Sequence, residues 1–504
     1  MPKIVMASAL LLITATAGCA QPEPPFEPPN VVLITIDALR PDYLSYAGHP
    51  NRTSPNLDAL ARDGVVFSQA LTSFPGTSPA MPSLMTGLFP SFEGVDKWVK
   101  TTRHGFNDFE SPDERDRRGL SSNLRMLAEI LNDHGYTTVG FNTNPNLSAH
   151  ANFDQGFDVY DEFEKYNHRQ HRTRDHRLIG NYPPAGVVMK RVLERMDDPV
   201  DGPVFFWMHF MDPHSPYLPP QRHARAFPHN YSSHSDLEIN EAVYHLLYSQ
   251  SGSAKRAARY PSPEDLGIEG EVFIDHVRGL YEAEIRFCDA QLRRLFRRLD
   301  SDPAWQNTLV VVTADHGEEF LEHGFVIHHV LSGLAEELIR IPLIVKLPTG
   351  TPSGVTVNEL VRIVDIAPTV LDYAGLGNEA NHMDGTSLRP LIEGQEGPAR
   401  TVFYSTIDYG IVRTARWKYR LIKHPESGGE PHERLFDIVA DPLEEYDVAE
   451  DHPDVLSELG ERYEAFAQHL RTRSAPPDTA GAPDAEELNA EELERLEALG
   501  YVAD

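Results

Sequence analysis

Cysteine is nearly absent from this chain: Cys19 and Cys288 are the only two among 504 residues. Two cysteines cannot build the disulfide framework of a small secreted domain, and they cannot supply a Cys-rich zinc site. At this length the chain is expected to form one large α/β domain, or two domains with a substantial core. Cys288 falls in a long helical pattern and is expected to be a buried core thiol.

Positive charge is also scarce, because 45 Lys and Arg face 76 Asp and Glu, for a net charge of −31. Such a surface repels phosphate backbones, so the sequence argues against nucleic acid as a partner. One basic cluster, residues 167–177, stands out from this acidic background. A solvated loop is the expected structure, and an anion-attracting rim of a pocket is the functional alternative.

Long apolar runs are missing as well. The run Ile4–Ile13 has the length of a signal-peptide core and is too short to span about 30 Å of hydrocarbon. The residues Thr16 to Cys19 resemble a bacterial lipobox, and a Pro-rich stretch follows them. We therefore expect a lipoprotein signal peptide at 1–19 and a tether at 20–29, with an ordinary secretory signal as the alternative. The expected location is the cell envelope, with lipid anchoring in the outer membrane or periplasm favoured and the anchor as the only membrane contact.

Beyond the tether, buried strand patterns alternate with helical ones. Near-continuous apolar runs occur at residues 31–36, 137–141, 204–208, 309–313 and 341–345, and helical periodicity at 124–131, 187–196 and 273–299. Apolar runs of this kind are typical of strands buried on both faces of a parallel sheet. The pattern predicts an α/β fold with a large, mostly parallel sheet flanked by helices, over residues 30–380.

The C-terminal part has a different character. Short strand patterns split by Gly and Pro turns fill residues 401–438, and a helix is expected at Pro453–Leu470. They predict a small antiparallel α+β subdomain at 381–473. Residues 474–486 have linker composition, and a short terminal helix is expected before Gly500.

Chemically useful residues follow the expected strands. Asp37 ends the first strand, and Asp315 and His316 come directly after a later one. Ligands of α/β sheets bind beyond the carboxyl ends of the strands, and carboxylate with imidazole suits a divalent metal. Asp37 could equally be a helix N-cap. Thr77 is expected at a helix N-terminus, where anions are favoured, although a simple threonine cap is the alternative there.

Histidines gather in two further segments. Residues 207–217 run from an apolar strand into a loop that carries His209, Asp212 and His214, and His328 with His329 follows the Asp315 segment. Single histidines are usually surface or core residues. A group of them beside expected strand ends is instead typical of a catalytic site.

Taken together, these segments resemble the sulfatase family of the alkaline phosphatase superfamily. The resemblance rests on residues 30–42, 54–67, 77–90, 205–217, 281–289, 313–324, 336–345 and 435–441, in the family order. It implies that Asp37, Asp315 and His316 bind metal, with Thr77 as a nucleophile that also contacts the metal. It further implies that His214 and His328 are cationic or proton-donating groups around the leaving group and that His329 is a neighbour of the bound substrate.

Two departures from the family pattern change the expected chemistry. Family sulfatases carry Cys or Ser in a C/S-x-P-x-R motif and convert it to formylglycine, whereas this chain has Thr77 and Met81 at the first and last positions. Oxidation of threonine cannot give an aldehyde. Thr-bearing relatives in the superfamily are phosphodiesterases, phosphonate hydrolases and headgroup transferases, so phosphate esters or diesters are expected to be favoured over sulfate esters.

A third departure concerns the metal. Ala38 stands where the family has a second Asp, which removes a hard oxygen ligand, while His316 adds nitrogen. This favours Zn²⁺ or Mn²⁺, with Ca²⁺ or Mg²⁺ as alternatives. Two-metal relatives use an Asp-x-x-x-His arrangement, but Pro216 stands where that histidine would follow Asp212. One divalent ion is therefore expected.

The expected substrate is an anionic ester, on a sulfated or phosphorylated glycan or lipid. Two other functions stay open at this point. One is a transferase that moves a phospho-headgroup onto an envelope glycan or lipid. The other is a catalytically inactive, sulfatase-like binding lipoprotein, which Ala38 and Met81 would suit.

Overall fold

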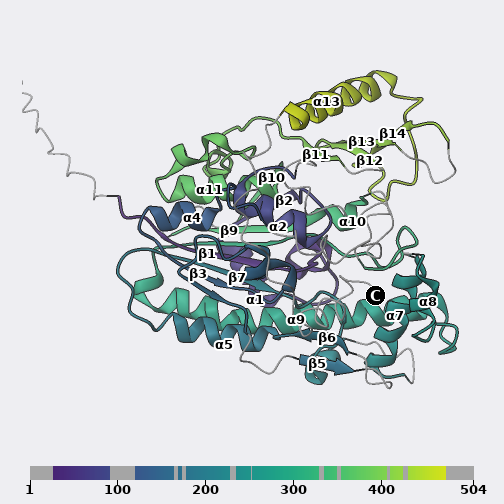
Figure 1. Cartoon of the computed structure of the whole chain (residues 1–504), viewed down its shortest axis with the longest axis horizontal. Helices are drawn as coiled ribbons and strands as arrows, with labels where there is room; N and C mark the ends of the chain where they lie inside the picture. Colours follow the sequence, from purple (N-terminus) through teal and green to yellow (C-terminus); the bar gives the residue numbers. More distant parts are fainter. Residues whose placement is uncertain are drawn as a thin grey trace, which may run out of the picture.

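The protein is built around one large mixed sheet (Figure 1). The computed structural model describes residues 26–90, 120–163, 169–172, 178–227, 234–250, 252–327, 334–348, 354–405, 409–423 and 429–472. The eight strands, in spatial order, are β10 (Val355–Arg362), β2 (Val65–Leu71), β9 (Arg340–Lys346), β8 (Thr308–Ala314), β1 (Asn30–Ile36), β7 (Val204–Phe210), β3 (Thr137–Phe141) and β4 (Val159–Asp161). The expected α/β sheet is confirmed.

The centre of the sheet is parallel. β1 lies between β7 and β8, and Ile36 at its end pairs with Phe210 and with Ala314. The residues that follow these three strands therefore leave the same edge of the sheet. β9 is the exception to the expected direction, because it runs antiparallel to both β8 and β2. An apolar strand that is buried on both faces has the same sequence pattern in either direction, so the sequence does not reveal that β9 is antiparallel.

Helices cover both faces of the sheet (Figure 1). The long α9 (Gly270–Ser301) packs against α5 (Ala185–Arg195) and α1 (Pro55–Asp63). On the other face, α2 (Thr77–Thr86) packs against α4 (Leu127–Asp133) and α11 (Ile366–Tyr373). The three helices expected from periodicity are present as α4, α5 and α9. Cys288 lies buried in α9, as its pattern predicted.

A second, smaller sheet follows the first. Its antiparallel strands are β11 (Val402–Ser405), β12 (Tyr409–Arg413), β13 (Trp417–Ile422) and β14 (His432–Asp437), in that order. Helix α13 (Pro453–Thr472) packs on this sheet, and Val412, Tyr419 and Leu459 belong to the core between them. The Tyr404 hydroxyl donates to the Thr72 carbonyl oxygen at 2.8 Å, which ties this unit to the large sheet.

Some elements differ from the sequence expectation. β2 and β10 have mixed burial patterns and were not predicted. The basic cluster expected as a solvated loop contains a strand, β5 (Arg169–Arg172), which pairs with β6 (Leu178–Tyr182). The loop interpretation was therefore wrong for these four residues, because backbone pairing to β6 needs no apolar pattern. Cys19, the tether up to residue 25 and the expected terminal helix lie outside the described residues.

Candidate active site

Two carboxylates meet at the shared edge of β1 and β8. Asp37 and Asp315 follow these strands directly, and both side chains are fully buried. Their ligand atoms and one from His209 lie within 4.8 Å of one another. Two buried carboxylates at this distance repel each other, so the arrangement favours a bound cation.

In each of the two carboxylates, one oxygen accepts hydrogen bonds from the protein and the other accepts none from the described residues. Asp37 Oδ2 accepts hydrogen bonds from Asn144 Nδ2 at 2.7 Å and from His209 Nε2 at 3.1 Å. Asp315 Oδ1 accepts from the backbone nitrogens of Ala38 at 3.2 Å and His316 at 2.9 Å. Asp37 Oδ1 and Asp315 Oδ2 are buried with no hydrogen-bond partner among the described residues. A buried carboxylate oxygen of this kind is unfavourable unless a cation binds it.

His316 faces these two remaining oxygens. Its Nδ1 lies 2.7 Å from the Gly317 carbonyl oxygen, which can only accept, so Nδ1 carries the proton. The lone pair is then on Nε2, which lies 3.5 Å from both Asp37 Oδ1 and Asp315 Oδ2. Each of these oxygens thus lies beside one imidazole nitrogen, and carboxylate with imidazole suits a divalent metal.

Gly317 makes this turn sterically possible. A Cβ at this position would lie 1.8 Å from the Glu337 carbonyl oxygen, so no larger residue fits. The Gly317 backbone nitrogen donates to the Leu338 carbonyl oxygen at 2.8 Å. The close approach brings the chain after β8 against the segment before β9 and sets the direction of His316.

Thr77 lies at the start of α2 and faces the same cluster. Its Oγ1 is 3.4 Å from His316 Nε2 and accepts from Asn144 Nδ2 at 3.4 Å. Gly76 is the N-cap of α2, and no side chain caps this end. The simple threonine cap is therefore excluded, and the hydroxyl of Thr77 is directed to the cluster at the positive end of the helix.

His209 and Asn144 were not assigned a role from the sequence. Trp207 Nε1 donates to Thr35 Oγ1 at 3.0 Å, and that hydroxyl lies 2.8 Å from His209 Nδ1. The hydroxyl proton therefore goes to Nδ1, which leaves the Nε2 proton for Asp37 Oδ2. His209 orients Asp37 through this chain of hydrogen bonds. Only the parallel register that places Thr35 beside His209 could have indicated it.

His214 lies near the cluster, with its ring centre 6.4 Å from that of His316. Its Nδ1 is 2.7 Å from the Ser215 carbonyl oxygen and carries the proton for the reason given for His316. Burial lowers the pKa of His214, although Asp37 opposes this shift. Asp212 serves a different purpose, since its Oδ2 accepts from the Ala185 backbone nitrogen at 2.7 Å, at the start of α5.

The charges of the cluster act on Asp37 and Asp315 in opposite directions. Burial alone would raise the pKa of Asp37, but His214, His209 and His316 together hold it below its ordinary value. Burial and then the nearby charge of Asp37 raise the pKa of Asp315. The site thus keeps at least one ionised carboxylate. His328 and His329 lie outside the described residues, so their expected roles stay predictions.

Comparisons with known proteins agree with this geometry. A family model described as "Sulfatase" matches residues 29–376, and one described as "N-sulphoglucosamine sulphohydrolase, C-terminal" matches residues 322–469. The chain belongs to the sulfatase family. Members of this family are ester hydrolases that use a metal ion, and the expected class of enzyme is confirmed.

Relatives and solved structures extend this result. An ulvan-active sulfatase of Formosa agariphila is 28% identical over 483 residues, covering 88% of this chain and 84% of the relative. A phosphonate monoester hydrolase of Agrobacterium radiobacter matches with a TM-score of 0.63 and 21% identity, over 88% of this chain and 96% of that one. A structure in complex with its substrate D-glucosamine-2-N,6-O-disulfate matches with a TM-score of 0.66 and 19% identity. The match covers 90% of this chain and 100% of that one. The two structural matches show the fold alone.

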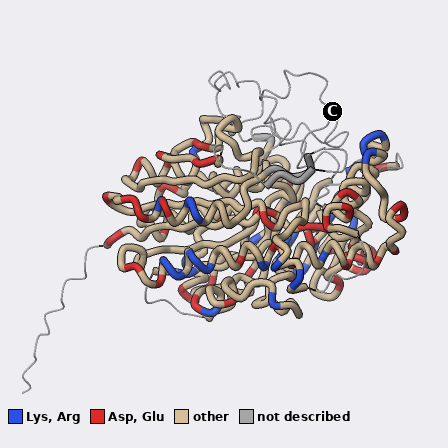
Figure 2. Tube along the Cα trace, turned by 90° about the horizontal axis from the view of Figure 1, so that it is seen from below, with Lys and Arg blue, Asp and Glu red and all other residues tan. Residues whose placement is uncertain are grey.

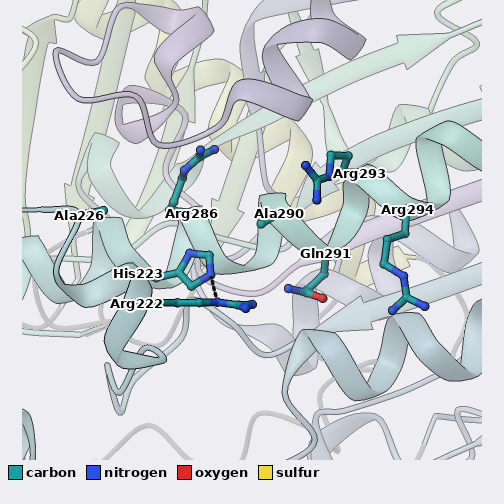
Figure 3. A pocket seen from close by; sticks show the side chains of 8 residues that line it. All are labelled: Arg222, His223, Ala226, Arg286, Ala290, Gln291, Arg293 and Arg294. Carbon is teal, nitrogen blue, oxygen red and sulfur yellow. Dashed lines mark hydrogen bonds between the residues drawn. The ribbon is translucent and has the colours of Figure 1, made fainter.

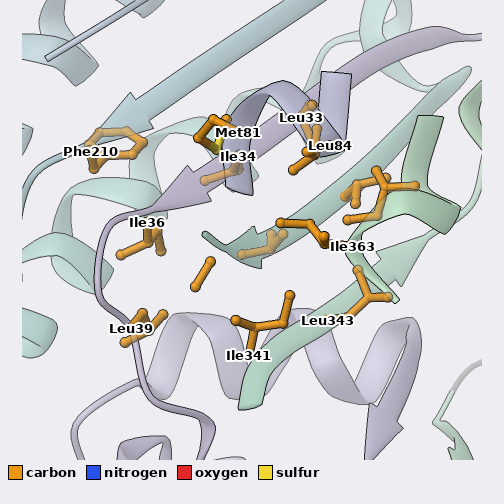
Figure 4. Packing of buried hydrophobic residues seen from close by; sticks show 14 of the residues in the cluster. Leu33, Ile34, Ile36, Leu39, Met81, Leu84, Phe210, Ile341, Leu343 and Ile363 are labelled. Carbon is orange, nitrogen blue, oxygen red and sulfur yellow. The ribbon is translucent and has the colours of Figure 1, made fainter. Parts of the chain in front are cut away.

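The packing of Met81 explains why this position differs from the arginine of the sulfatase motif. It lies one turn along α2 from Thr77 and is fully buried, and Figure 4 shows it in the packing with Ile34 of β1 and Leu84 of α2. The position belongs to the hydrophobic core. A guanidinium placed among these apolar neighbours would be buried without a partner, so Met81 is compatible with the packing and the family arginine is not.

Ala38, the other departure from the sulfatase pattern, also has a structural role. Its φ of 54° lies in the left-handed region, which costs a non-glycine residue about 1 kcal/mol or more. The Tyr281 hydroxyl donates to the Ala38 carbonyl oxygen at 2.7 Å, while the Ala38 nitrogen donates to Asp315. The strained backbone thus links the ends of β1 and β8 and supplies no side-chain ligand.

Proposed function

We propose that this protein hydrolyses phosphate or phosphonate esters with Thr77 as the nucleophile and one divalent metal held by Asp37, Asp315 and His316. One observation carries the proposal: a buried oxygen from each carboxylate lacks a hydrogen-bond partner in the described chain, and both lie 3.5 Å from His316 Nε2. The Thr77 hydroxyl lies 3.4 Å from the same nitrogen. A site that had decayed to a binding function would have no need of such oxygens.

The donor set of two carboxylates and one imidazole favours Zn²⁺ or Mn²⁺ over Ca²⁺ or Mg²⁺. When bound, such an ion lowers the pKa of a coordinated hydroxyl and offsets charge on the transferred group. Asn144 contributes from the protein side, since its Nδ2 donates both to Asp37 Oδ2 and to Thr77 Oγ1. It holds the nucleophile and a metal ligand in one arrangement.

The proposed reaction has two displacements. In the first, neutral His214 accepts the Thr77 hydroxyl proton and Thr77 Oγ1 forms a bond to phosphorus. The bond from phosphorus to the leaving oxygen breaks, and His214 passes the proton to that oxygen. In the second, a water oxygen attacks phosphorus, the bond to Oγ1 breaks, and the proton of the water returns to Thr77. The N-terminus of α2 stabilises the negative charge that develops on the transferred group.

Threonine decides between the two ester classes in this proposal. A formylglycine hydrate releases sulfate by collapsing to an aldehyde, and Thr77 has no such route. A phosphorylated threonine can be cleared by water. The test is purified protein assayed with p-nitrophenyl phosphate, bis-p-nitrophenyl phosphate, p-nitrophenyl phenylphosphonate and p-nitrophenyl sulfate, together with metal analysis. Sulfate turnover above phosphorus-ester turnover would contradict the proposed preference.

A sulfate ester on a sugar is the second candidate substrate. The match of residues 322–469 to an N-sulphoglucosamine sulphohydrolase C-terminal model supports it, as does the similarity to an ulvan-active sulfatase. Both candidates share an anionic ester as substrate, and we propose that it is carried on a glycan. Release of inorganic sulfate from D-glucosamine-2-N,6-O-disulfate by wild type, but not by Thr77→Ala, would favour the second candidate.

We also propose that the protein is anchored to the cell envelope through Cys19. Among the described residues, no helix combines the length and the apolar character that a membrane crossing requires. The proposal thus rests on the sequence around Cys19 alone. Cys19→Ala should move the protein from the membrane fraction to the soluble fraction, because the acyl chains supply the attachment. A wild type found wholly in the soluble fraction would contradict it.

A further inference from the structure

A basic cavity lies on the helical face of the molecule, away from Asp37. It has a volume of about 470 Å³ and lies between α6 (Gln221–Ala224) and the C-terminal half of α9. Four arginines and one histidine line it together with Gln291, and Figure 3 shows their side chains: Arg222, His223, Arg286, Arg293 and Arg294. No acidic residue is among the described residues that line it.

This arrangement is unusual in a chain of net charge −31. Figure 2 shows acidic segments around the whole outline of the molecule. Several arginines are matched by carboxylates: Arg40 by Asp42 at 2.8 Å and by Glu322 at 2.7 Å, and Arg286 of the cavity by Asp289 at 3.4 Å. Arg293 and Arg294 are exposed and have no ion pair within the described part of the chain. Their positive charge is therefore not balanced by the protein there.

Of the two residues from α6, Arg222 carries the positive charge and His223 holds it in place. The Arg222 guanidinium donates from Nε to His223 Nε2 at 2.9 Å, so this nitrogen of the histidine is an acceptor. Burial and the charges of Arg222 and Arg286 lower the pKa of His223 to about 4. The ring is thus neutral at neutral pH and leaves Arg222 fixed at one side of the cavity.

We propose that this cavity is an exosite that binds sulfate or phosphate groups of an anionic glycan chain. The inference rests on the proposed function, because the glycan is the carrier of the ester that the metal site hydrolyses. Arginine suits such groups, since its planar fork gives two parallel hydrogen bonds to one oxyanion. Gln291 adds an amide that can both donate to and accept from sugar hydroxyls.

Helix α9 connects the cavity to the metal site. Tyr281 of α9 reaches the first site, where its hydroxyl donates to the carbonyl oxygen of Ala38, next to Asp37. At 1.5 Å of rise per residue, positions 286–294 follow Tyr281 by about 8 to 20 Å along the helix axis. That separation is larger than one sugar ring and requires a ligand of several units. A single small ester would occupy only the metal site.

A glycan fits these observations better than a membrane surface. A site that inserts into a membrane presents exposed apolar side chains beside its charges. The large apolar residues that are exposed in the described chain are Phe26, Val200, Val439, Leu443 and Tyr446, and none of them lines the cavity. The ligand is therefore expected to enter the cavity as a flexible polyanion, with salt-dependent affinity.

The test compares binding and catalysis in the full-length protein. Heparin serves as a highly sulfated glycan, hyaluronan as an unsulfated one, and vesicles of anionic phospholipid as a membrane. Wild type should bind heparin most tightly, and the double variant Arg293→Ala/Arg294→Ala should bind it about tenfold more weakly at low salt. Arg297→Ala is the matched control, because Arg297 is an exposed arginine of α9 outside the cavity. It should bind heparin as wild type does.

The double variant should keep the wild-type kcat/KM on p-nitrophenyl phosphate, because neither arginine is near the metal site. Equal heparin binding by wild type and double variant would overturn the exosite. So would vesicle binding that exceeds heparin binding and is lost in the double variant. A wild type that binds heparin through these arginines but hydrolyses no ester would instead overturn the proposed function alone.

Discussion

Glu336 and Asp315 are both buried carboxylates, but the chain surrounds them differently. Glu336 receives two hydrogen bonds from Arg413, at 2.9 and 3.0 Å, and Lys418 Nζ lies 3.7 Å from it. Asp315 and Asp37 have no arginine or lysine in ion-pair contact among the described residues, and each keeps an oxygen without a partner. Glu336 joins the small sheet to the segment before β9, whereas Asp37 and Asp315 lie at the candidate metal site.

This difference distinguishes the charge of Glu336, which supports the fold, from the charges of Asp37 and Asp315, which we propose bind a metal. Glu336, which supports the fold, is neutralised by cations of the same chain, because an unpaired buried charge is costly. Asp37 and Asp315 carry that cost, and a divalent ion from solution can offset it.

Replacing the nucleophile should have the largest effect. Thr77→Ala is expected to lower kcat by a factor on the order of 10³ or more, because no neighbouring hydroxyl can form the covalent intermediate. The matched control is Thr86→Ala, since the Thr86 hydroxyl donates within the same helix to the Pro82 carbonyl oxygen at 2.7 Å. That variant should keep its rate. Steady-state assays measure both, and a Thr77→Ala enzyme with most of its activity would remove Thr77 as nucleophile.

Removing the charge of Glu336 should damage the fold. Glu336→Gln leaves the buried Arg413 without its ion-pair partner, although Lys418 keeps Glu444, and we expect it to lower the free energy of unfolding by about 3 kcal/mol. In metal-free protein, Asp315→Asn removes a charge that burial and the nearby charge of Asp37 disfavour, and it should cost far less. Urea denaturation of both chelator-treated variants measures the difference. Similar losses in the two variants would contradict the comparison.

Loss of the metal should follow from Asp315→Asn. A saturating ion at 100 times its Kd stabilises the wild type by about 2.7 kcal/mol, and this contribution should vanish in the variant. Thermal denaturation with and without a chelator measures it, alongside the metal content of each protein. A chelator should lower the Tm of wild type only. If the variant keeps wild-type metal content, Asp315 is not a ligand.

Lowering the pH should reduce the contribution of Glu336 to the free energy of unfolding, and this effect should be smaller than those above. Burial opposes ionisation of Glu336, yet Arg413 and Lys418 hold its pKa below the ordinary value of 4.5. A depressed pKa means that the stabilising contribution is complete above the unfolded pKa and is lost as pH falls through the folded one. The stability gap between wild type and Glu336→Gln should thus narrow as the pH falls below 4.5, the ordinary pKa of the group. A stability gap that widens as the pH falls would contradict the lowered pKa of Glu336.

The sequence predicted the central strands well for a physical reason. β1, β7 and β8 are buried on both faces, so their residues form apolar runs that can be recognised without tertiary information. Helix α9 was predicted for a similar reason, since its apolar stripe persists over eight turns of helix. β2 and β10 are only partly buried, and their mixed patterns gave no comparable signal.

For the candidate site, the residue types came from the sequence and their geometry from the fold. Asp37, Thr77, Asp315 and His316 could be chosen from their places after strands or at a helix start, where backbone groups and side chains converge. His209 and Asn144 could not, because their roles depend on which strands are neighbours and in what register. Local pattern determines that an element forms and which residues end it. Only tertiary packing decides which of these ends meet. It therefore also decides which oxygens of Asp37 and Asp315 accept hydrogen bonds and which are left for a metal, because most of those hydrogen bonds join segments that are far apart in the chain.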